Sequence, residues 1–461
     1  MNEVLDKYIN EMKDSIINNT CEIINIPSVF NDNDETPFGI YTVEALNYIL
    51  DLGKSFGFKT KNIDNKCGYI EFGKGDRLLG IIAHLDVVPA ENDWSYSPFN
   101  ATVDNGNIYG RGTVDDKGPA IAALFAMKAV ADNYTPDKRV RLILGLNEEN
   151  DWKCIERYKE TEKMPDISFS PDANFPCIYA EKTIESIYLK QKYEKNSTIY
   201  LKDISTNNNA INVVPKFCSA TLEFDNSKIY NIQDTVKKII DKYNYNINIE
   251  KIDSTHIKLT SSGTAAHAAH PELGVNALSK LLIVLYDLFN EYDIHLDILD
   301  YFVRYIGDNY TGKGLGINFE DESGILTLNT ARFFLEKDYL NIGFNLRIPV
   351  TYDYNNIEKE FKKYCTDNLE VTVARIQEPL YFEKTHPLVQ KLCNIFNDYN
   401  NSNLEPMAIG GGTYARAFEN CISFGPQMPN AKDMCHQTDE YISIDNLMFC
   451  AKVYAQAILD L

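Results

Sequence analysis

The sequence lacks any apolar run approaching the roughly 20 residues with which a helix crosses a bilayer. Its N-terminus, MNEVLDKYINEMKDSIINN, also lacks the uninterrupted apolar core of a secretory signal, because charged residues occur throughout it. Neither a membrane anchor nor export is therefore expected. Both absences predict a cytoplasmic protein.

Paired cysteines are absent as well. The ten cysteines are scattered and none forms a Cys-x-x-Cys pair, which disfavours both a disulfide framework and a thiolate zinc site. Scattered thiols suit a reducing compartment. Any metal ion is therefore expected to bind through histidine and carboxylate side chains.

Basic residues are scarce relative to acidic ones. The chain has 45 Lys and Arg against 66 Asp and Glu, which gives a formal net charge of -21. This charge repels phosphate backbones and anionic membrane surfaces, so no nucleic-acid or membrane partner is expected. Part of the excess could be carboxylates gathered around a cation, although most surface carboxylates are simply solvated.

The length and the apolar pattern predict an α/β fold in two domains. A chain of 461 residues exceeds the usual span of one hydrophobic core. Helical spacing covers residues 3–26 and 43–52, whereas the apolar runs at 78–89 and 139–150 read as strands buried on both faces. An Ala-rich helix between these runs completes a strand, helix, strand order that is typical of a parallel, helix-flanked sheet.

The middle of the chain has a different pattern. Residues 183–375 contain alternating strands such as SIYLKQKY and HIKLTSSG, interleaved with helices such as VNALSKLLIVLYDLFNEY. This pattern predicts an inserted α+β domain. Residues 376–461 again show the sequence pattern of the N-terminal part, and they are expected to complete the first domain together with residues 1–182.

Polar residues follow several of the predicted strand ends. His84 and Asp86 are separated by one residue, so Asp86 could hold one imidazole nitrogen while the other faces a metal. Asp115 precedes the predicted helix, where a carboxylate can be a metal ligand or a helix cap. Glu148 and Glu149 end the second strand, at the edge where ligands of open α/β sheets gather.

Two further candidates lie in turns. Asp172 follows a proline in SFSPDANFP, and His436 lies in MCHQTDE near the C-terminus. Taken alone, each candidate has an ordinary explanation as a cap, a solvated carboxylate, or a buried or surface histidine. The ordered set of two histidines and three acidic residues after successive strand ends is more persuasive, because it offers more donors than one tetrahedral ion needs.

Six motifs occur in order across nearly the whole chain: HLDVVP, GRGTVDDKGP, EENDWK, SPDANFP, GGGTYAR and CHQTDE. Through them the sequence resembles the co-catalytic zinc peptidases related to carboxypeptidase G, aminoacylase and succinyl-diaminopimelate desuccinylase. Within that group it is most similar to the PepV-type bacterial dipeptidases. The main departure is NEEND, where relatives usually carry Asp or Thr before the two glutamates and Thr-Gly or Ser after them; it replaces no proposed ligand or base.

The resemblance implies a catalytic domain that holds two divalent ions, with zinc expected and manganese or cobalt as alternatives. His84 and Asp172 would hold one ion, Glu149 and His436 the other, and Asp115 would bridge them. Residues 183–375 would form a lid domain. They have room for two of the halves that dimeric relatives carry, which favours a monomer.

Catalytic roles follow from the same resemblance. Asp86 would orient His84, and Glu148 would take a proton from the attacking water and return it to the departing amine. His267, in GTAAHAAHPELGVNA, would reach the developing oxyanion from the lid. His270 has no counterpart in the family pattern. Without that pattern, both histidines would be interpreted as surface residues.

A set of substrate-binding residues is also implied, suited to a dipeptide's free carboxylate. It consists of Arg347 in FNLRIP, Asn212 in NVVP, and Gly410, Gly411 and Gly412. On sequence alone, the glycines could form a flexible loop and Arg347 could be a solvated charge.

The leading hypothesis is a metal-dependent dipeptidase with a small peptide as substrate. Its closest rival is an amidohydrolase that removes the acyl group from N-acyl amino acids by the same metal chemistry. A third hypothesis, a catalytically silent peptide-binding protein, is disfavoured because Glu148 and every candidate ligand are present.

Overall fold

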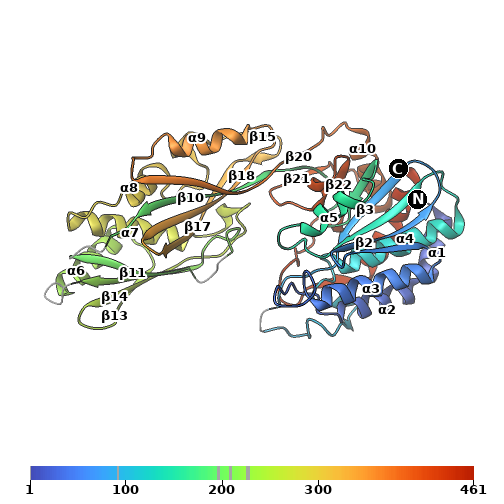
Figure 1. The fold of residues 1–461 in the computed structure, drawn as a ribbon, viewed down its shortest axis with the longest axis horizontal. Coiled ribbons are helices and arrows are strands. Elements are labelled where there is room, and N and C mark those ends of the chain that lie inside the picture. Colours follow the sequence, from blue (N-terminus) through green and yellow to red (C-terminus); the bar gives the residue numbers. More distant parts are fainter. Residues whose placement is uncertain (1, 91–92, 195–197, 207–209, 225–228) are drawn as a thin grey trace. The chain divides into compact units, whose positions relative to one another are not determined.

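The computed structural model describes residues 2–90, 93–194, 198–206, 210–224 and 229–461. The chain divides into two compact units, which are described separately (Figure 1). Unit 1 comprises Met1–Ala180, Leu380–Met407 and Gly412–Leu461, and unit 2 comprises Glu181–Pro379 and Ala408–Gly411. The segment Ala408–Gly411, which the sequence pattern groups with the first domain, thus packs with unit 2.

Unit 1 contains a large sheet and the helices that cover it. Its helices are α1 (Glu3–Glu11), α2 (Lys13–Ile24), α3 (Ile40–Ser55), α4 (Lys117–Asn133), α5 (Lys153–Thr161), α10 (Pro387–Asn400) and α11 (Ile444–Asp460). The strands of the large sheet are β1 (Lys59–Ile63), β2 (Cys67–Gly73), β3 (Leu78–His84), β6 (Arg139–Gly145), β7 (Ile167–Ser170), β9 (Ile178–Glu181), β20 (Leu380–Tyr381), β21 (Met407–Ile409) and β22 (Cys421–Ser423). Smaller pairings involve β4 (Thr102–Asp104), β5 (Asn107–Tyr109), β8 (Ala173–Asn174), β23 (Pro426–Gln427) and β24 (Tyr441–Ser443).

The strand order of the large sheet is β1-β2-β6-β3-β7-β22-β9-β20, with β21 also paired to β9. Its centre is parallel, because β3 pairs in parallel with β6 and β7, and β22 does so with β7. Every residue of β3 is buried, as expected for a central strand covered on both faces. The predicted α/β class with a mainly parallel central sheet is confirmed; the edge strands β1 and β2 add antiparallel pairs.

Helix α4 forms the crossover between β3 and β6. It packs against α11, α2 and α1 as well as against both strands. Its Ala-rich sequence is apolar on nearly all sides, which is typical of a helix enclosed by other elements. The crossover therefore places the turn before α4 at the carboxyl edge of the sheet.

Both predicted strands end earlier than the sequence suggested. The apolar runs continue to residues 89 and 150, but β3 ends at His84 and β6 at Gly145. Leu85 and Val87 are nevertheless buried, because the chain after β3 packs on other loops: Val87 donates its N–H to the carbonyl of Ser28 at 3.1 Å. Hydrophobicity alone did not distinguish a buried strand from a buried loop.

Unit 2 contains two four-stranded antiparallel sheets. One has the order β17-β18-β10-β19 and the other β11-β12-β14-β13. Their strands are β10 (Thr183–Lys192), β11 (Ile199–Thr206), β12 (Phe217–Phe224), β13 (Ile247–Lys251), β14 (His256–Ser262), β17 (Thr327–Glu336), β18 (Tyr339–Ile348) and β19 (Leu369–Gln377); β15 (Glu320–Asp321) and β16 (Gly324–Ile325) form a small hairpin. The helices are α6 (Ile229–Tyr243), α7 (Ala277–Glu291), α8 (Asp297–Tyr305) and α9 (Ile357–Lys362).

Helix α7 joins the two sheets of unit 2 into one core. It packs against β12 and β14 of one sheet and against β17 of the other (Figure 1). Burial alternates along β14, so this sheet buries one face and exposes the other. Across the part of the chain that the structure describes, no helix is both long and apolar enough to span a membrane.

Candidate metal centre

The candidate ligands lie at the carboxyl edge of the parallel sheet in unit 1. His84 is the last residue of β3, Glu149 follows β6, and Asp172 follows β7. Asp115 lies in the turn before α4, and His436 lies between β23 and β24. Neighbouring parallel strands therefore bring three of these side chains to one edge, and two loops add the others.

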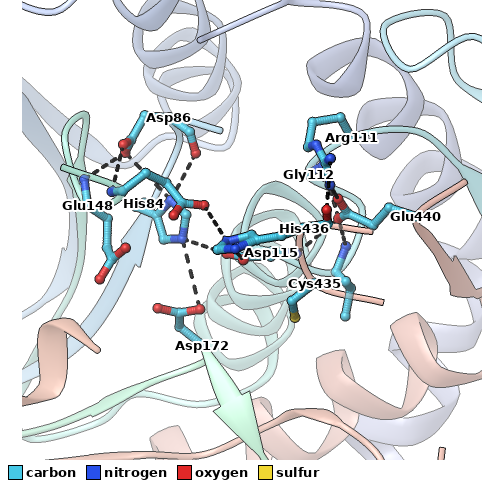
Figure 2. Close-up of polar contacts among 12 residues, drawn as sticks. His84, Asp86, Arg111, Gly112, Asp115, Glu148, Asp172, Cys435, His436 and Glu440 are labelled. Atoms are coloured by element: carbon cyan, nitrogen blue, oxygen red, sulfur yellow. Dashed lines mark hydrogen bonds and ion pairs between the residues drawn. The ribbon is translucent and has the colours of Figure 1, made fainter. Parts of the chain in front are cut away.

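Asp115 occupies the centre of the cluster (Figure 2). One of its carboxylate oxygens lies 2.8 Å from Nε2 of His84, and the other lies 3.1 Å from Nε2 of His436. His436 Nε2 also lies 3.0 Å from Glu149 Oε1, and His84 Nε2 lies 3.9 Å from Asp172 Oδ1. The Nε2 atom of each imidazole thus meets one oxygen of Asp115 and one further carboxylate.

This arrangement suits divalent ions. One donor atom each from His84, Asp115 and Glu149 lies within 4.8 Å of the others. Two donor atoms bound at about 2.0–2.1 Å to one tetrahedral ion lie ~3.3 Å apart. The distances between the donor atoms of this cluster, 2.8–3.9 Å, span that value. Imidazole and carboxylate donors are those that zinc, manganese and cobalt accept, so the residues present fit such a group.

Asp86 contacts both His84, at the end of β3, and the turn after β6 that carries two glutamates. Its main-chain carbonyl lies 2.9 Å from Nδ1 of His84, and one carboxylate oxygen lies 3.5 Å from the same nitrogen. The carboxylate mainly accepts main-chain N–H groups, from Glu148 at 3.0 Å and from Glu149 at 3.1 Å. Asp86 therefore orients the imidazole and fixes the turn that carries both glutamates.

The other side of that turn is held by an aromatic residue that was not among the predicted site residues. Trp152 donates its indole N–H to the carbonyl of Glu148 at 2.9 Å, and its main-chain N–H to the carbonyl of Asn147 at 3.1 Å. Its ring meets Tyr414 edge to face, with centroids 5.6 Å apart. Gly145 allows this approach, because a Cβ there would lie 2.5 Å from Tyr414. Trp152 and Tyr414 lie within EENDWK and GGGTYAR, so the motifs themselves were the available signal.

Charges in the cluster stabilise one another. Burial lowers the pKa of His84, but hydrogen bonds with Asp115 and Asp86 outweigh it and hold the pKa well above its ordinary value. Burial also acts to lower the pKa of His436, yet Glu149 and Asp115 raise it to about 11. Burial acts to raise the pKa of Asp115, whereas the two imidazoles hold it below its ordinary range.

Two other carboxyl groups of the cluster have pKa values above their ordinary range. Burial raises the pKa of Glu148 to about 8, with further contributions from neighbouring carboxylates that His84 opposes. Burial and the charge of Asp115 raise the pKa of Asp172 well above its ordinary value. Crowded, buried carboxylates of this kind are typical of functional sites and favour the binding of a cation.

The predicted recognition residues of the lid lie in unit 2. The carbonyl of Asn212 accepts a hydrogen bond from the N–H of Ala268 at 2.8 Å, and Val213 forms an isolated antiparallel bridge with His267. Nδ1 of His267 accepts the N–H of Ala269 at 3.3 Å, which favours the tautomer with its proton on Nε2. His267 itself is exposed. The structure thus brings Asn212 and His267 side by side.

Arg347 and Gly410 join the same region of unit 2. Arg347, buried on β18, donates from Nη1 to the carbonyl of Gly410 at 2.5 Å and from Nε to Asn345 at 3.0 Å. A Cβ on Gly410 would lie only 2.6 Å from that of Ala269, so a side chain there would clash. Gly411 also packs with unit 2, whereas Gly412 belongs to unit 1.

Comparisons with known proteins place the chain in a peptidase family. The model of peptidase family M20/M25/M40 matches residues 80–460. Two relatives are named putative dipeptidases: YtjP of Bacillus subtilis (strain 168) is 35% identical over 97% of both chains, and SH1171 of Staphylococcus haemolyticus (strain JCSC1435) is 34% identical over 98% of both.

Solved structures show the same fold. Human carnosine dipeptidase 1 aligns with a TM-score of 0.59 and 14% identity, covering 99% of this chain and 97% of its own. The di-peptidase Dug1p of Saccharomyces cerevisiae aligns with a TM-score of 0.59 and 14% identity, covering 99% of this chain and 98% of its own.

Proposed function

Because this chain belongs to peptidase family M20/M25/M40 and is a metallopeptidase of that family, we propose that it hydrolyses the peptide bond of dipeptides. The near full-length similarity to two relatives named putative dipeptidases supports this substrate class. The observation that carries the chemistry is the central position of Asp115, whose two oxygens each face a different histidine.

In this proposal His84 and Asp172 would hold one divalent ion, Glu149 and His436 would hold the other, and Asp115 would contribute to both. When bound, the ions supply Lewis acidity that favours deprotonation of a water and polarises the scissile carbonyl. Asp86 keeps the His84 ring oriented through the 2.9 Å contact to its Nδ1. Zinc is the expected metal, with manganese and cobalt as alternatives.

Glu148 moves the proton. Among the described residues its carboxylate accepts no hydrogen bond, while its main chain is fixed by Asp86 and Trp152. A carboxylate that is positioned but unengaged can accept a proton from the attacking water and then return it to the departing amine. Asp86 and Glu148 therefore have separate tasks, orientation and proton transfer.

Substrate recognition is assigned to residues of unit 2, together with Gly412 of unit 1. The tautomer of His267 that the Ala269 contact favours makes its Nε2 a donor, suited to an oxyanion. Arg347 supplies a guanidinium for a free carboxylate, with the glycine run Gly410–Gly412 and Asn212 contributing main-chain or amide groups. These residues would bind the termini of a short substrate and so limit its length.

The substrate class is tested with purified, zinc-loaded protein. A panel of dipeptides is assayed beside N-acetyl and N-succinyl amino acids that carry the same C-terminal residue. We expect turnover of dipeptides with little or none of the acylated compounds. Turnover of only the acylated compounds would contradict the proposal and identify the protein as an amidohydrolase.

A further inference from the structure

Two of the proposed ligands lie on turns that leave the same end of one small ladder. β5 pairs antiparallel with β24, with Tyr109 opposite Tyr441. The chain after Tyr109 leads to Asp115, and the chain before Tyr441 carries His436. Both turns therefore begin from adjacent strand ends, although more than 300 residues of sequence separate them.

A buried ion pair joins these two turns. Arg111 and Glu440 are 3% and 0% exposed, and Nη1 of Arg111 lies 2.7 Å from Oε2 of Glu440. Figure 2 shows the pair next to the Asp115 and His436 side chains. Each member also binds the main chain of a turn that carries a ligand.

Glu440 holds the Asp115 turn. Its Oε1 accepts the N–H groups of Gly112 and Val114, both at 3.0 Å, and that of Asp115 at 3.4 Å. Its main-chain carbonyl accepts the N–H of Gly110 at 2.9 Å. One residue from the C-terminal motif thus fixes the backbone conformation of the central ligand.

Arg111, which lies on the Asp115 turn, in return holds the turn that carries His436. Its guanidinium donates to the carbonyls of His436 and Gln437, each at 3.3 Å. His436 has a φ of 63°, a left-handed conformation that is unusual for a non-glycine residue and needs support from its surroundings. Arg111 gives that support to the residue that carries the second imidazole.

We propose that Arg111 and Glu440 are positioning residues that set the distance between Asp115 and His436 and thereby the affinity of the metal centre. The inference rests on the metal ligands of the proposed function. A buried ion pair by itself contributes little net stability compared with apolar residues of the same size. The hydrogen bonds to both turns give this pair a specific task beyond stability.

The test substitutes Glu440 with glutamine. Gln keeps the size of the side chain but places an NH₂ group where a carboxylate oxygen accepts hydrogen bonds, so it cannot satisfy both Arg111 and the three N–H groups. Chelated wild type and E440Q are titrated with zinc, and the affinity is measured by calorimetry. Loss of an outer partner of a metal ligand typically weakens metal binding by about 10–100-fold, which is the expected effect.

The matched control is Glu71→Gln. Glu71 is 7% exposed and pairs with Arg141 on β6 at 2.6 Å, so this variant also breaks a buried glutamate–arginine pair of unit 1. We expect E71Q to bind zinc as the wild type does, even where its melting temperature falls as far as that of E440Q. Unchanged zinc affinity in E440Q, or an equal loss in E71Q, would overturn the proposal.

A second variant keeps the test decisive if E440Q does not fold. Arg111→Lys retains the positive charge but lacks the planar fork that reaches two carbonyls and Glu440 together, so zinc affinity should again fall. Unchanged affinity in R111K would overturn the proposal. Zinc affinity is independent of the substrate class, so absence of dipeptide turnover by the wild type would refute the proposed function and leave this inference standing.

Discussion

At the scale of single residues, Glu148 differs from the other acidic residues of the cluster. Its main chain is held by the Asp86 carboxylate on the N–H side and by the Trp152 indole on the carbonyl side. Glu149, the next residue, faces His436 at 3.0 Å. Adjacent glutamates on one turn thus have distinct surroundings, which is the basis for assigning one to proton transfer and the other to metal binding.

Substituting Glu148 with glutamine should separate these two tasks. General base catalysis typically contributes about 10²–10⁴-fold to the rate, so kcat should fall by that order while two ions stay bound. The measurement combines steady-state kinetics with metal analysis of the dialysed protein. Glu149→Gln serves for comparison and should lose metal as well as rate. A kcat unchanged in E148Q would refute the role of Glu148.

The Trp152 indole can be tested by a substitution that removes its N–H group from the turn. Trp152→Phe keeps an aromatic ring beside Tyr414 but loses the hydrogen bond to Glu148, and a net loss of about 1 kcal/mol corresponds to a roughly fivefold lower kcat. Metal analysis of the same variant is the control, and its zinc content should equal that of the wild type because the indole hydrogen bond holds Glu148 rather than a proposed metal ligand. A kcat equal to that of the wild type would contradict the positioning role of Trp152.

The sequence indicated which residues to consider but not which atoms make the contacts. Asp86 was expected to orient His84, yet the shorter contact comes from its main-chain carbonyl, and its carboxylate fixes the glutamate turn. Glu440 is the last residue of the motif CHQTDE, and the sequence predicted no role for it. Its role depends on β5 and β24 being adjacent, a long-range pairing that local sequence patterns do not encode.

At the scale of secondary-structure elements, β10 of unit 2 carries an unusual residue. Glu185 lies between Leu346 of β18 and Ile376 of β19 and is only 1% exposed. Burial raises its pKa from 4.5 to about 7, with a smaller contribution from Glu358. The folded state therefore binds this proton more tightly than the unfolded chain does.

The higher pKa of Glu185 in the folded state makes the stability of unit 2 depend on pH. The stabilising effect of the bound proton is fully present below pH 4.5 and is lost as the pH rises through about 7, up to roughly 3 kcal/mol in all. Glu185→Gln should therefore stabilise unit 2 at pH 8 and leave it nearly unchanged at pH 5. Hydrogen exchange of the β10 and β18 amides, compared between variant and wild type at each pH, measures this difference.

An exposed glutamate on the neighbouring strand provides the control for this prediction. Glu370→Gln on β19 should give the same protection as the wild type at both pH values. A stabilisation by E185Q that is equal at pH 5 and pH 8 would contradict the assignment to a buried, titrating carboxyl.

Element types followed from the sequence more readily than their ends. The period and composition of β3, α4 and β6 identified the parallel unit, because buried strands and enclosed helices have distinct apolar patterns. The ends depend on tertiary packing. Leu85 and Val87 extend the apolar run of β3 and are buried, but beyond His84 the pairing continues only as an isolated bridge between Val87 and Val29.

At the scale of the whole molecule, each unit gathers residues from distant parts of the chain. Unit 1 unites the first 180 residues with two C-terminal segments, and its five proposed ligands come from both. Unit 2 brings Asn212, His267, Arg347 and Gly410 together. The ordered motifs predicted these groupings through the family resemblance, whereas spacing along the chain alone would not.

Two metal ions held by the unit 1 cluster are expected to be required for dipeptide hydrolysis. The most direct measurement removes metal with a chelator, adds zinc back in steps, and records dipeptide turnover together with zinc bound per chain. We predict no turnover without metal and a rate that reaches its maximum at two ions per chain. Full turnover by the metal-free protein, or a maximum at one ion, would contradict the account.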